Sequence, residues 1–553
     1  MPATPASALA TRYSLLATHY PLVVAVMIGA ALRLVGLTRQ GFWTDELYVV
    51  WEARQPLDMV LNPQLHIHHP PGYRLALHAW MGLGGVGEFW LRLLPALAGV
   101  LLIVVAWALA RALWPDHFWA AGGAAILVAT SPFLVHYSQD VTTYSWTALW
   151  VSLSVLFLVR AWREDRAWLW AAWGVSMAVS LYSHYFSIFP VAVEVIAALA
   201  LGVVEVIRKG IRKKDAVEQG MARRAFFNDP AIARLTHAIL AVVGAALLFA
   251  PWVWTVLTNG GKALSPIFFP VSVDTQPVGW VPTLFAGYAN ESFWQSDVGK
   301  WIVWGLLGVL FLWAGWRLSR VRSRRGALAA GLVLAWGVAA IVGPYLFLRL
   351  TTPPEAITPV RFAAMAAPAL MLGLGALVGS LPALGRALLL GGWLALSGVQ
   401  LYGEYAAPPK QDWRGIMATV EREALPGDEM LGFTAFHAGA AAAYYSVPVD
   451  VKGGWFVGRG EDPAGAAFWF PPEWRWRGFL ETDAYSSTDF QGEMQRRIEG
   501  AQRLWYLAGD GTDGTYKPSP AAERALSALG WQPTQEWRAS PLVLRLYVRT
   551  GGQ

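Results

Sequence analysis

The amino-acid sequence predicts an α-helical protein that crosses a membrane about eleven times and carries an α/β domain at its C-terminal end. Of its 553 residues, 55% are hydrophobic and only 14% are charged, whereas soluble chains carry about 25% charged residues. Apolar runs long enough to span a bilayer recur up to residue 404. The composition excludes intrinsic disorder, and the absence of cysteine excludes disulfides and thiolate metal sites.

Eleven apolar runs of about 17–25 residues are the candidate spans. They cover residues 20–38, 93–113, 118–135, 143–161, 167–184, 186–207, 236–257, 300–317, 326–348, 360–380 and 385–404. The first run continues without a small-residue cleavage site, so we expect a retained span rather than a removed signal peptide.

Two predicted domains follow from the composition: a transmembrane domain, 1–404, and an α/β domain, 405–553. In the second, apolar runs shorten to strand length and alternate with helical patterns. The pattern predicts helices at 412–424, 438–445, 487–500 and 520–529 and strands at 429–434, 503–508 and 542–548.

Basic residues predict the orientation. Thirteen of the 43 lysines and arginines lie in two predicted loops, 208–235 and 317–325, and loops rich in these residues face the cytoplasm. With eleven spans, the N-terminus is then cytoplasmic and the C-terminal domain extracytoplasmic. This topology also explains the net charge of +6. No basic soluble face with aromatic platforms is present, which argues against a nucleic-acid partner.

The first extracytoplasmic loop, 39–92, holds most of the candidate functional residues. Asp45 and Glu46 are adjacent carboxylates at the membrane surface. They are either the first turn of a helix with Thr44 as N-cap, or a functional pair. His66, His68 and His69 precede Pro70 and Pro71; this cluster is either a polar interfacial group, a phosphate site or a divalent-metal site.

Three further charged residues are candidates at the same depth. Asp140 precedes the span at 143–161, where it either caps the helix or serves as a second site acid. Arg361 lies at the start of the span 360–380, where it either snorkels to the interface or pairs with a lipid phosphate. Arg74 is an additional cation of the first loop.

Taken in chain order, these motifs resemble the GT-C glycosyltransferases that use polyprenyl-phosphate sugars. The similar members are bacterial proteins of the protein-mannosyltransferase, galacturonosyltransferase and aminoarabinose-transferase kinds. The resembling stretches are Phe42–Glu46, His69–Tyr73, Glu88–Leu93 with Pro95, Ser131–Phe133 with Tyr137–Asp140, and Arg361 with Pro368. The chain departs from the family at His68–His69, where aminoarabinose transferases have Glu-Lys, and at Val141–Thr142, where many relatives have Ala-Arg.

The resemblance implies an inverting transfer from a polyprenyl-phosphate sugar on the outer side of the bacterial cytoplasmic membrane. Asp45 corresponds to the catalytic base and Glu46 to the second acid of its motif. Arg361 and His69 are the expected partners of the donor phosphate. The acceptor class is open between a cell-envelope glycan, a lipid and a protein. Metal use is open as well, and no ligands are assigned.

Two other functions compete with this reading. A lipid-linked sugar transporter or flippase needs polar residues along its spans, and Arg33, Glu194 and Glu205 are the main charges there. A non-catalytic envelope assembly subunit would use the C-terminal domain as its binding module. Only the transferase requires the carboxylate of Asp45.

Overall fold

The structure is a computed structural model that divides into two compact units. Unit 1 comprises Met1–Leu37 and Leu61–Ala407, and unit 2 comprises Thr38–Val60 and Pro408–Gln553. The described residues are 5–62, 69–217, 229–258, 277–289, 296, 298–299, 301–305, 324–351, 360–407, 410–432, 441–445, 450–452, 495, 498, 500–510, 520–539 and 541–550. Residues 38–60 lie between two spans in the sequence and nevertheless group with the C-terminal residues.

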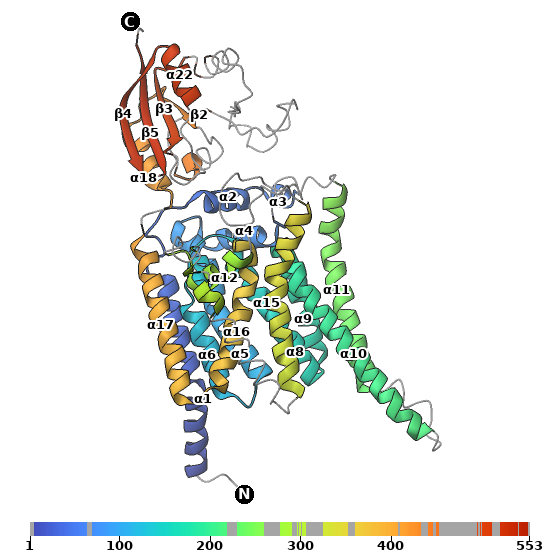
Figure 1. The fold of residues 1–553 in the computed structure, drawn as a ribbon. Helices are drawn as coiled ribbons and strands as arrows, with labels where there is room; N and C mark the ends of the chain where they lie inside the picture. Colours follow the sequence, from blue (N-terminus) through green and yellow to red (C-terminus); the bar gives the residue numbers. More distant parts are fainter. Residues whose placement is uncertain are drawn as a thin grey trace. The chain divides into compact units, whose positions relative to one another are not determined.

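Unit 1 is a bundle of helices (Figure 1). Its helices are α1 (Pro5–Leu34), α4 (Gly72–Gly84), α5 (Glu88–Leu113), α6 (Phe118–Thr130), α7 (Pro132–Ser138), α8 (Thr143–Glu164), α9 (Ala167–Ser183), η1 (Tyr185–Ser187), α10 (Ile188–Val217), α11 (Pro230–Thr258), α12 (Pro277–Ala286), α15 (Arg324–Thr351), η4 (Val360–Ala366), α16 (Ala367–Ser380) and α17 (Ala383–Ala406).

Small residues let the central helices of unit 1 approach closely. A Cβ atom added at Gly375 or Gly379 of α16 would lie 2.8 Å from the Cβ of Ala124 or Ala120 of α6. Such contacts hold membrane helices together, because lipid supplies no hydrophobic drive between helices. Large apolar side chains such as Trp254 on α11 are exposed instead, as expected of surfaces that face lipid. α1 packs on α5 and α6, and α10 on α11 and α15.

The number of spans is lower than the eleven that the sequence predicted. Among the described residues, seven helices are long and apolar enough to cross a membrane, or up to eight if α6 and α7 form one span. The difference arises at three places. The apolar stretch His19–Leu34 is only part of the longer helix α1, Pro5–Leu34, and is shorter than a span. α9 has only 17 residues, and most of the predicted span 300–317 lies outside the described residues.

A bend of 56° separates α6 from α7, and Arg33 stabilises it. Pro132 begins α7 and has no N–H, so the carbonyl of Val128 loses its partner four residues on. The buried guanidinium of Arg33 donates to this carbonyl at 3.1 Å and to that of Ala129 at 2.9 Å. It also donates to Oγ of Ser138 at 3.1 Å. This intramembrane charge therefore replaces the backbone bonds that the bend removes.

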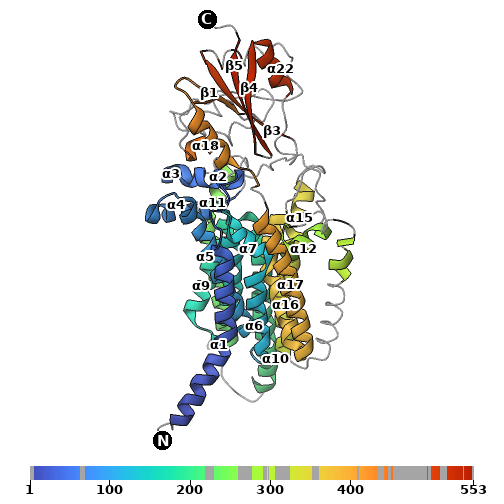
Figure 2. The same cartoon turned by 90° about the vertical axis from the view of Figure 1, so that its left-hand side faces the viewer.

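Unit 2 combines residues of the first loop with a five-stranded sheet (Figure 2). Its elements are α2 (Thr44–Ala53), α3 (Leu57–Val60), α18 (Trp413–Glu423), β1 (Glu429–Gly432), β2 (Asp450–Lys452), β3 (Arg503–Gly509), α22 (Pro520–Ala528), β4 (Trp531–Ala539) and β5 (Leu542–Arg549). The strand order is β2-β1-β3-β5-β4. β1 pairs in parallel with β2 and β3, whereas β5 pairs antiparallel with β3 and β4.

The small C-terminal sheet confirms the α/β class predicted for this part of the chain. The predicted helices at 412–424 and 520–529 correspond to α18 and α22, and the three predicted strands to β1, β3 and β5. The predicted helix 487–500 and the first residues of 438–445 lie largely outside the described residues. β4 was not predicted, because it is a mostly exposed edge strand that contains Pro533.

Candidate active site

The two carboxylates of the acidic pair have different surroundings. α2 begins at Thr44 and has Trp43 as its N-cap residue. Glu46 is fully buried, and its carboxylate accepts a hydrogen bond of 3.3 Å from the backbone N–H of Trp43. A glutamate at the third helical position makes this bond in a capping box. Asp45 is half-buried. Glu46 therefore caps the helix, and Asp45 stays accessible to solvent.

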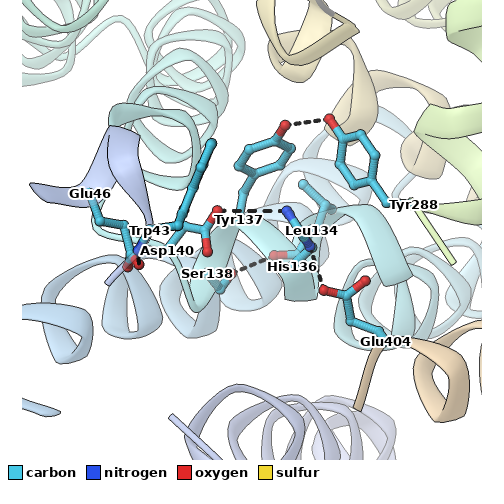
Figure 3. A network of polar contacts seen from close by, with 9 residues as sticks. All are labelled: Trp43, Glu46, Leu134, His136, Tyr137, Ser138, Asp140, Tyr288 and Glu404. Atoms are coloured by element: carbon cyan, nitrogen blue, oxygen red, sulfur yellow. Dashed lines mark hydrogen bonds and ion pairs between the residues drawn. The ribbon is translucent and has the colours of Figure 1, made fainter. Parts of the chain in front are cut away.

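A second polar group lies in unit 1 where α7 ends (Figure 3). His136 Nδ1 lies 2.6 Å from a carboxylate oxygen of Glu404 on α17. His136 Nε2 lies 3.6 Å from Oδ2 of Asp140. The N-cap residue of α8 is Thr142, so Asp140 contacts a buried imidazole rather than capping the helix that follows it.

The side-chain amide of Gln139 holds the chain next to Asp140. Its Nε2 donates to the backbone carbonyls of Leu32 at 3.0 Å and Val35 at 3.1 Å. The last carbonyls of a helix have no partner within the helix. Gln139 therefore caps the C-terminal end of α1 and places Asp140 at this end of the bundle.

Imidazole and guanidinium side chains gather in unit 1 from three separate elements. His69 and Arg74 flank the start of α4, His184 lies in the turn between α9 and η1, and Arg361 lies in η4. The rings of His69 and His184 are 4.6 Å apart. The positive charges of Arg74 and Arg361 both act on His184. We call these four residues the cationic cluster.

Within this cluster His184 is a neutral hydrogen-bond donor. It is 2% exposed, and burial, followed by the charges of Arg74 and Arg361, lowers its pKa to about 3. Its Nδ1 accepts the backbone N–H of Phe186 at 3.1 Å, so the single ring proton is on Nε2. This buried Nε2 has no hydrogen-bond partner among the described residues. Such a donor indicates a position for an acceptor atom from outside the chain.

Tyr144, at the start of α8, contacts both His184 of the cationic cluster and Tyr137 of α7. Its ring centroid lies 5.9 Å from that of His184 and 4.9 Å from that of Tyr137. The hydroxyl of Tyr137 is hydrogen-bonded to that of Tyr288 (Figure 3). One end of unit 1 thus combines cations, a carboxylate and aromatic rings, a combination suited to a sugar phosphate.

Gly72 allows α4 to reach this cluster. A Cβ atom added at Gly72 would lie 2.7 Å from the backbone oxygen of Tyr182 at the end of α9. Only glycine permits this approach, which brings the first turn of α4, with Arg74, beside the turn that carries His184.

We expect Gly72→Ala to lower the transfer activity that the sequence motifs imply by about tenfold or more, because the clash is with backbone and cannot be relieved by a rotamer change. The measurement is initial transfer rate at equal protein level in membranes. Gly82→Ala is the matched control, since a Cβ atom there meets nothing within 4 Å. Equal rates for the two variants would contradict the assigned approach of α4 to α9.

The candidate site residues fall into both units. Asp45 and Glu46 belong to unit 2, whereas His69, Arg74, Asp140 and Arg361 belong to unit 1. The metal candidates His66 and His68 lie outside the described residues. No group of three or more histidine, aspartate or glutamate side chains able to hold a metal is found in the part of the chain that the structure describes.

Two residues of the site were missed by sequence reasoning. His184 and Glu404 each lie beside a long apolar run, where one polar residue carries little signal. The sequence indication for His184 was its position at the end of the predicted span 167–184. The buried Glu194 lies instead among α8, α9 and α10, where its carboxyl oxygen accepts hydrogen bonds from Ser154 at 2.5 Å and Trp173 at 2.7 Å.

Comparison with known proteins agrees with the predicted fold. Residues 68–214 match the family model of dolichyl-phosphate-mannose-protein mannosyltransferases, and no curated protein matches the chain. ArnT from Cupriavidus metallidurans bound to undecaprenyl phosphate is 16% identical, with a TM-score of 0.54 over 96% of this chain and 98% of that chain. Its apo state gives 0.55 at 16% identity over 97% and 98%.

A more distant structure shares the fold over less of its own length. The oligosaccharyltransferase of Archaeoglobus fulgidus in its apo form is 14% identical, with a TM-score of 0.50 over 90% of this chain and 70% of that chain. Together with the match of residues 68–214, these similarities confirm the GT-C fold that the sequence motifs predicted.

Proposed function

From the GT-C fold of this multi-pass membrane protein, we propose that it is an inverting glycosyltransferase that takes one sugar from a polyprenyl-phosphate donor. The acceptor is a hydroxyl-bearing glycan, lipid or protein on the outer side of the bacterial cytoplasmic membrane. In this arrangement the N-terminus is cytoplasmic, and the C-terminal domain lies outside the membrane. The cationic cluster binds the donor phosphate, and Asp45 is the general base.

The cationic cluster is the observation that carries this proposal. Two guanidinium groups act on one buried imidazole, and like charges brought together in a desolvated place are stabilised by an anion. Arg74 is 1% exposed, so its charge is weakly screened. The Nε2–H of His184 adds a neutral donor. A phosphate diester with its sugar matches this set of donors.

The proposed chemistry is a single displacement at the anomeric carbon. The Asp45 carboxylate removes the proton of the acceptor hydroxyl as the hydroxyl oxygen forms its bond to that carbon. The bond from the anomeric carbon to the phosphate oxygen breaks, and the lipid phosphate leaves with the electron pair. Arg361, Arg74 and His69 stabilise the charge that develops on it. Asp140, next to His136, is the second acid proposed for the site.

A transfer assay tests the proposed function. Membranes that contain the protein are incubated with a panel of radiolabelled polyprenyl-phosphate hexoses and pentoses and with envelope extract as acceptor. We expect label from one donor to move into a non-donor product, and that donor identifies the sugar. Movement of intact labelled donor across reconstituted vesicles, without a new product from any donor, would favour the flippase alternative.

The role of the His184 Nε2–H as a hydrogen-bond donor gives a second test. We expect His184→Leu to lower kcat/KM by about 10²-fold, as removal of a donor to a developing oxyanion does. His184→Gln keeps an N–H and should stay within about tenfold of the parent protein.

The protonation state of His184 supplies a control for these two substitutions. Because the pKa of His184 is lowered to about 3, the ring stays neutral at all pH values near neutrality, and its titration adds nothing there. His184→Gln should therefore leave the pH profile between about pH 5 and pH 8 unchanged in shape. A profile that loses a step near the ordinary histidine pKa would contradict a neutral donor.

A further inference from the structure

The start of the C-terminal sequence, Gln411–Arg414, holds the acidic motif of the first loop. Gln411 Oε1 accepts hydrogen bonds from the backbone N–H of Thr44 at 3.0 Å and from its hydroxyl at 2.5 Å. Trp413 Nε1 donates to the same hydroxyl at 3.2 Å. All three side chains are buried. Thr44 is the first residue of α2, and its N–H has no partner within the helix. This N–H is hydrogen-bonded instead to a residue more than three hundred and sixty positions away in the sequence.

Contacts on both sides of Thr44 extend this attachment. The backbone N–H of Phe42 donates to the hydroxyl of Tyr445 at 3.2 Å, and the ring of Phe42 lies 4.9 Å from that of Tyr444. Lys410 Nζ lies 4.4 Å from the ring centroid of Trp43. Hydrogen bonds and ring contacts therefore fix each residue from Phe42 to Thr44.

Arg414 fixes the chain before the motif. Its Nη2 donates to the backbone carbonyls of Thr38 at 3.1 Å and Gln40 at 2.9 Å. A Cβ atom added at Gly41 would lie 2.7 Å from the Cβ of Arg414. The two segments are thus in direct contact at a glycine, and residues 38–60 form one compact unit with the C-terminal domain.

None of these bonds uses the carboxylate of Asp45. Gln411 satisfies the N–H of Thr44, and Glu46 satisfies that of Trp43. The backbone is therefore held at Trp43 and Thr44, the two residues that precede Asp45.

We propose that Gln411 is a positioning residue for the catalytic base, and that Asp45 moves with the C-terminal domain as one body. This inference rests on the proposed role of Asp45. Gln411 itself touches neither donor nor acceptor in this proposal. It fixes the first turn of α2, and any movement of the C-terminal domain relative to the membrane bundle carries the base with it.

Substitution of Gln411 tests the positioning role. We expect Gln411→Leu to lower kcat by about 10²-fold, the loss that follows from roughly 1 Å of misplacement of a reacting group. The KM for donor should stay within about threefold, because the donor site lies in unit 1. Gln411→Glu retains an acceptor for Thr44 and should restore most of kcat. Gln532→Leu, at an exposed position of β4, is the matched control and should behave as the parent protein.

Two kinetic outcomes would overturn the positioning role. One is a Gln411→Leu variant with unchanged kcat. The other is a parallel loss of activity and protein level in both Gln411→Leu and Gln411→Glu, since this would mark Gln411 as a residue needed for folding alone.

A disulfide tests the attachment independently of Gln411. The chain has no cysteine, so Gly41→Cys with Arg414→Cys introduces the only two thiols. The 2.7 Å between the Cβ positions needs to relax by about 1 Å to reach disulfide geometry. We expect the bond to form in the full-length protein on mild oxidation, scored by the mass shift of a thiol-blocking reagent, and less of it after Gln411→Leu.

The cross-linked protein then reports whether the attachment persists through the reaction. We expect the oxidised double variant to transfer sugar as fast as its own reduced form, with each single variant as control. Failure to form the bond, or activity lost on oxidation and regained on reduction, would overturn the proposal. These readouts separate the two ideas: if Asp45→Asn proves fully active, the base assignment fails while the disulfide yield still measures the attachment.

Discussion

Asp45→Asn is expected to lower the transfer rate by about 10³-fold, the contribution of a positioned general base. The substitution preserves the size of the side chain and its hydrogen-bonding oxygen and removes the basic carboxylate. The hydroxyl acceptor then has to lose its proton to water in the transition state. Donor binding should be retained, because the cationic cluster belongs to unit 1, so the loss should appear in kcat rather than in KM for donor.

Glu46→Gln is the matched control for this substitution. It replaces the carboxylate of the adjacent residue with an amide, as Asp45→Asn does. A glutamine accepts the capping hydrogen bond from the N–H of Trp43 as a glutamate does. We expect its activity to stay within about threefold of the parent protein. Glu46→Ala should instead destabilise the first turn of α2 by about 1 kcal/mol.

The measurement is single-turnover transfer from labelled donor, with protein level and donor binding determined on the same preparations. Full activity of Asp45→Asn would remove Asp45 as the base. Equal loss in Asp45→Asn and Glu46→Gln would contradict the division of roles between the two acids.

Arg361→Met should have the second largest effect, about a 10²- to 10³-fold loss of kcat/KM. A methionine keeps much of the apolar stem and removes the charge and all donor groups. The leaving lipid phosphate then develops its charge with one cation fewer. Arg361→Lys retains the charge without the planar fork of the guanidinium, so we expect it to recover only part of the loss.

Arg386→Met is the control for loss of an arginine from this bundle. Arg386 lies in the first turn of α17, at the opposite end of that helix from Glu404, and stacks over the ring of Trp119 at 4.7 Å. We expect this variant to transfer at the parent rate. Displacement of a radiolabelled polyprenyl phosphate by unlabelled donor measures binding directly. Unchanged binding and unchanged kcat/KM in Arg361→Met would exclude Arg361 from the phosphate site.

Some of the site was open to prediction because it depends on local sequence. The ordered motifs from Phe42 to Pro368 led to the GT-C fold, and the comparisons confirm this fold. Runs of apolar residues placed most helices, since the bilayer demands a minimum length of apolar chain. The count failed where a helix is short, as in α9.

Residues that act through distant partners were not open to prediction. Arg33 appeared as an anomalous charge inside a span, and only the packing of α1 beside α6 shows that it completes the carbonyls freed by Pro132. His184 gave almost no signal, since its neutral donor state depends on burial and on Arg74 and Arg361. Both roles depend on residues far away in the chain.

By itself, the sequence determined that this protein is helical, spans a membrane and carries a C-terminal α/β domain, because composition and periodicity are local properties. The GT-C fold followed from the resemblance of its ordered motifs to that family. Only the tertiary structure decided which acid caps α2, which imidazole is a donor, and that residues 38–60 pack with the C-terminal domain. Burial and hydrogen-bond partners decide these features, and they exist only when Thr44 meets Gln411 or His184 meets Phe186 in the folded chain.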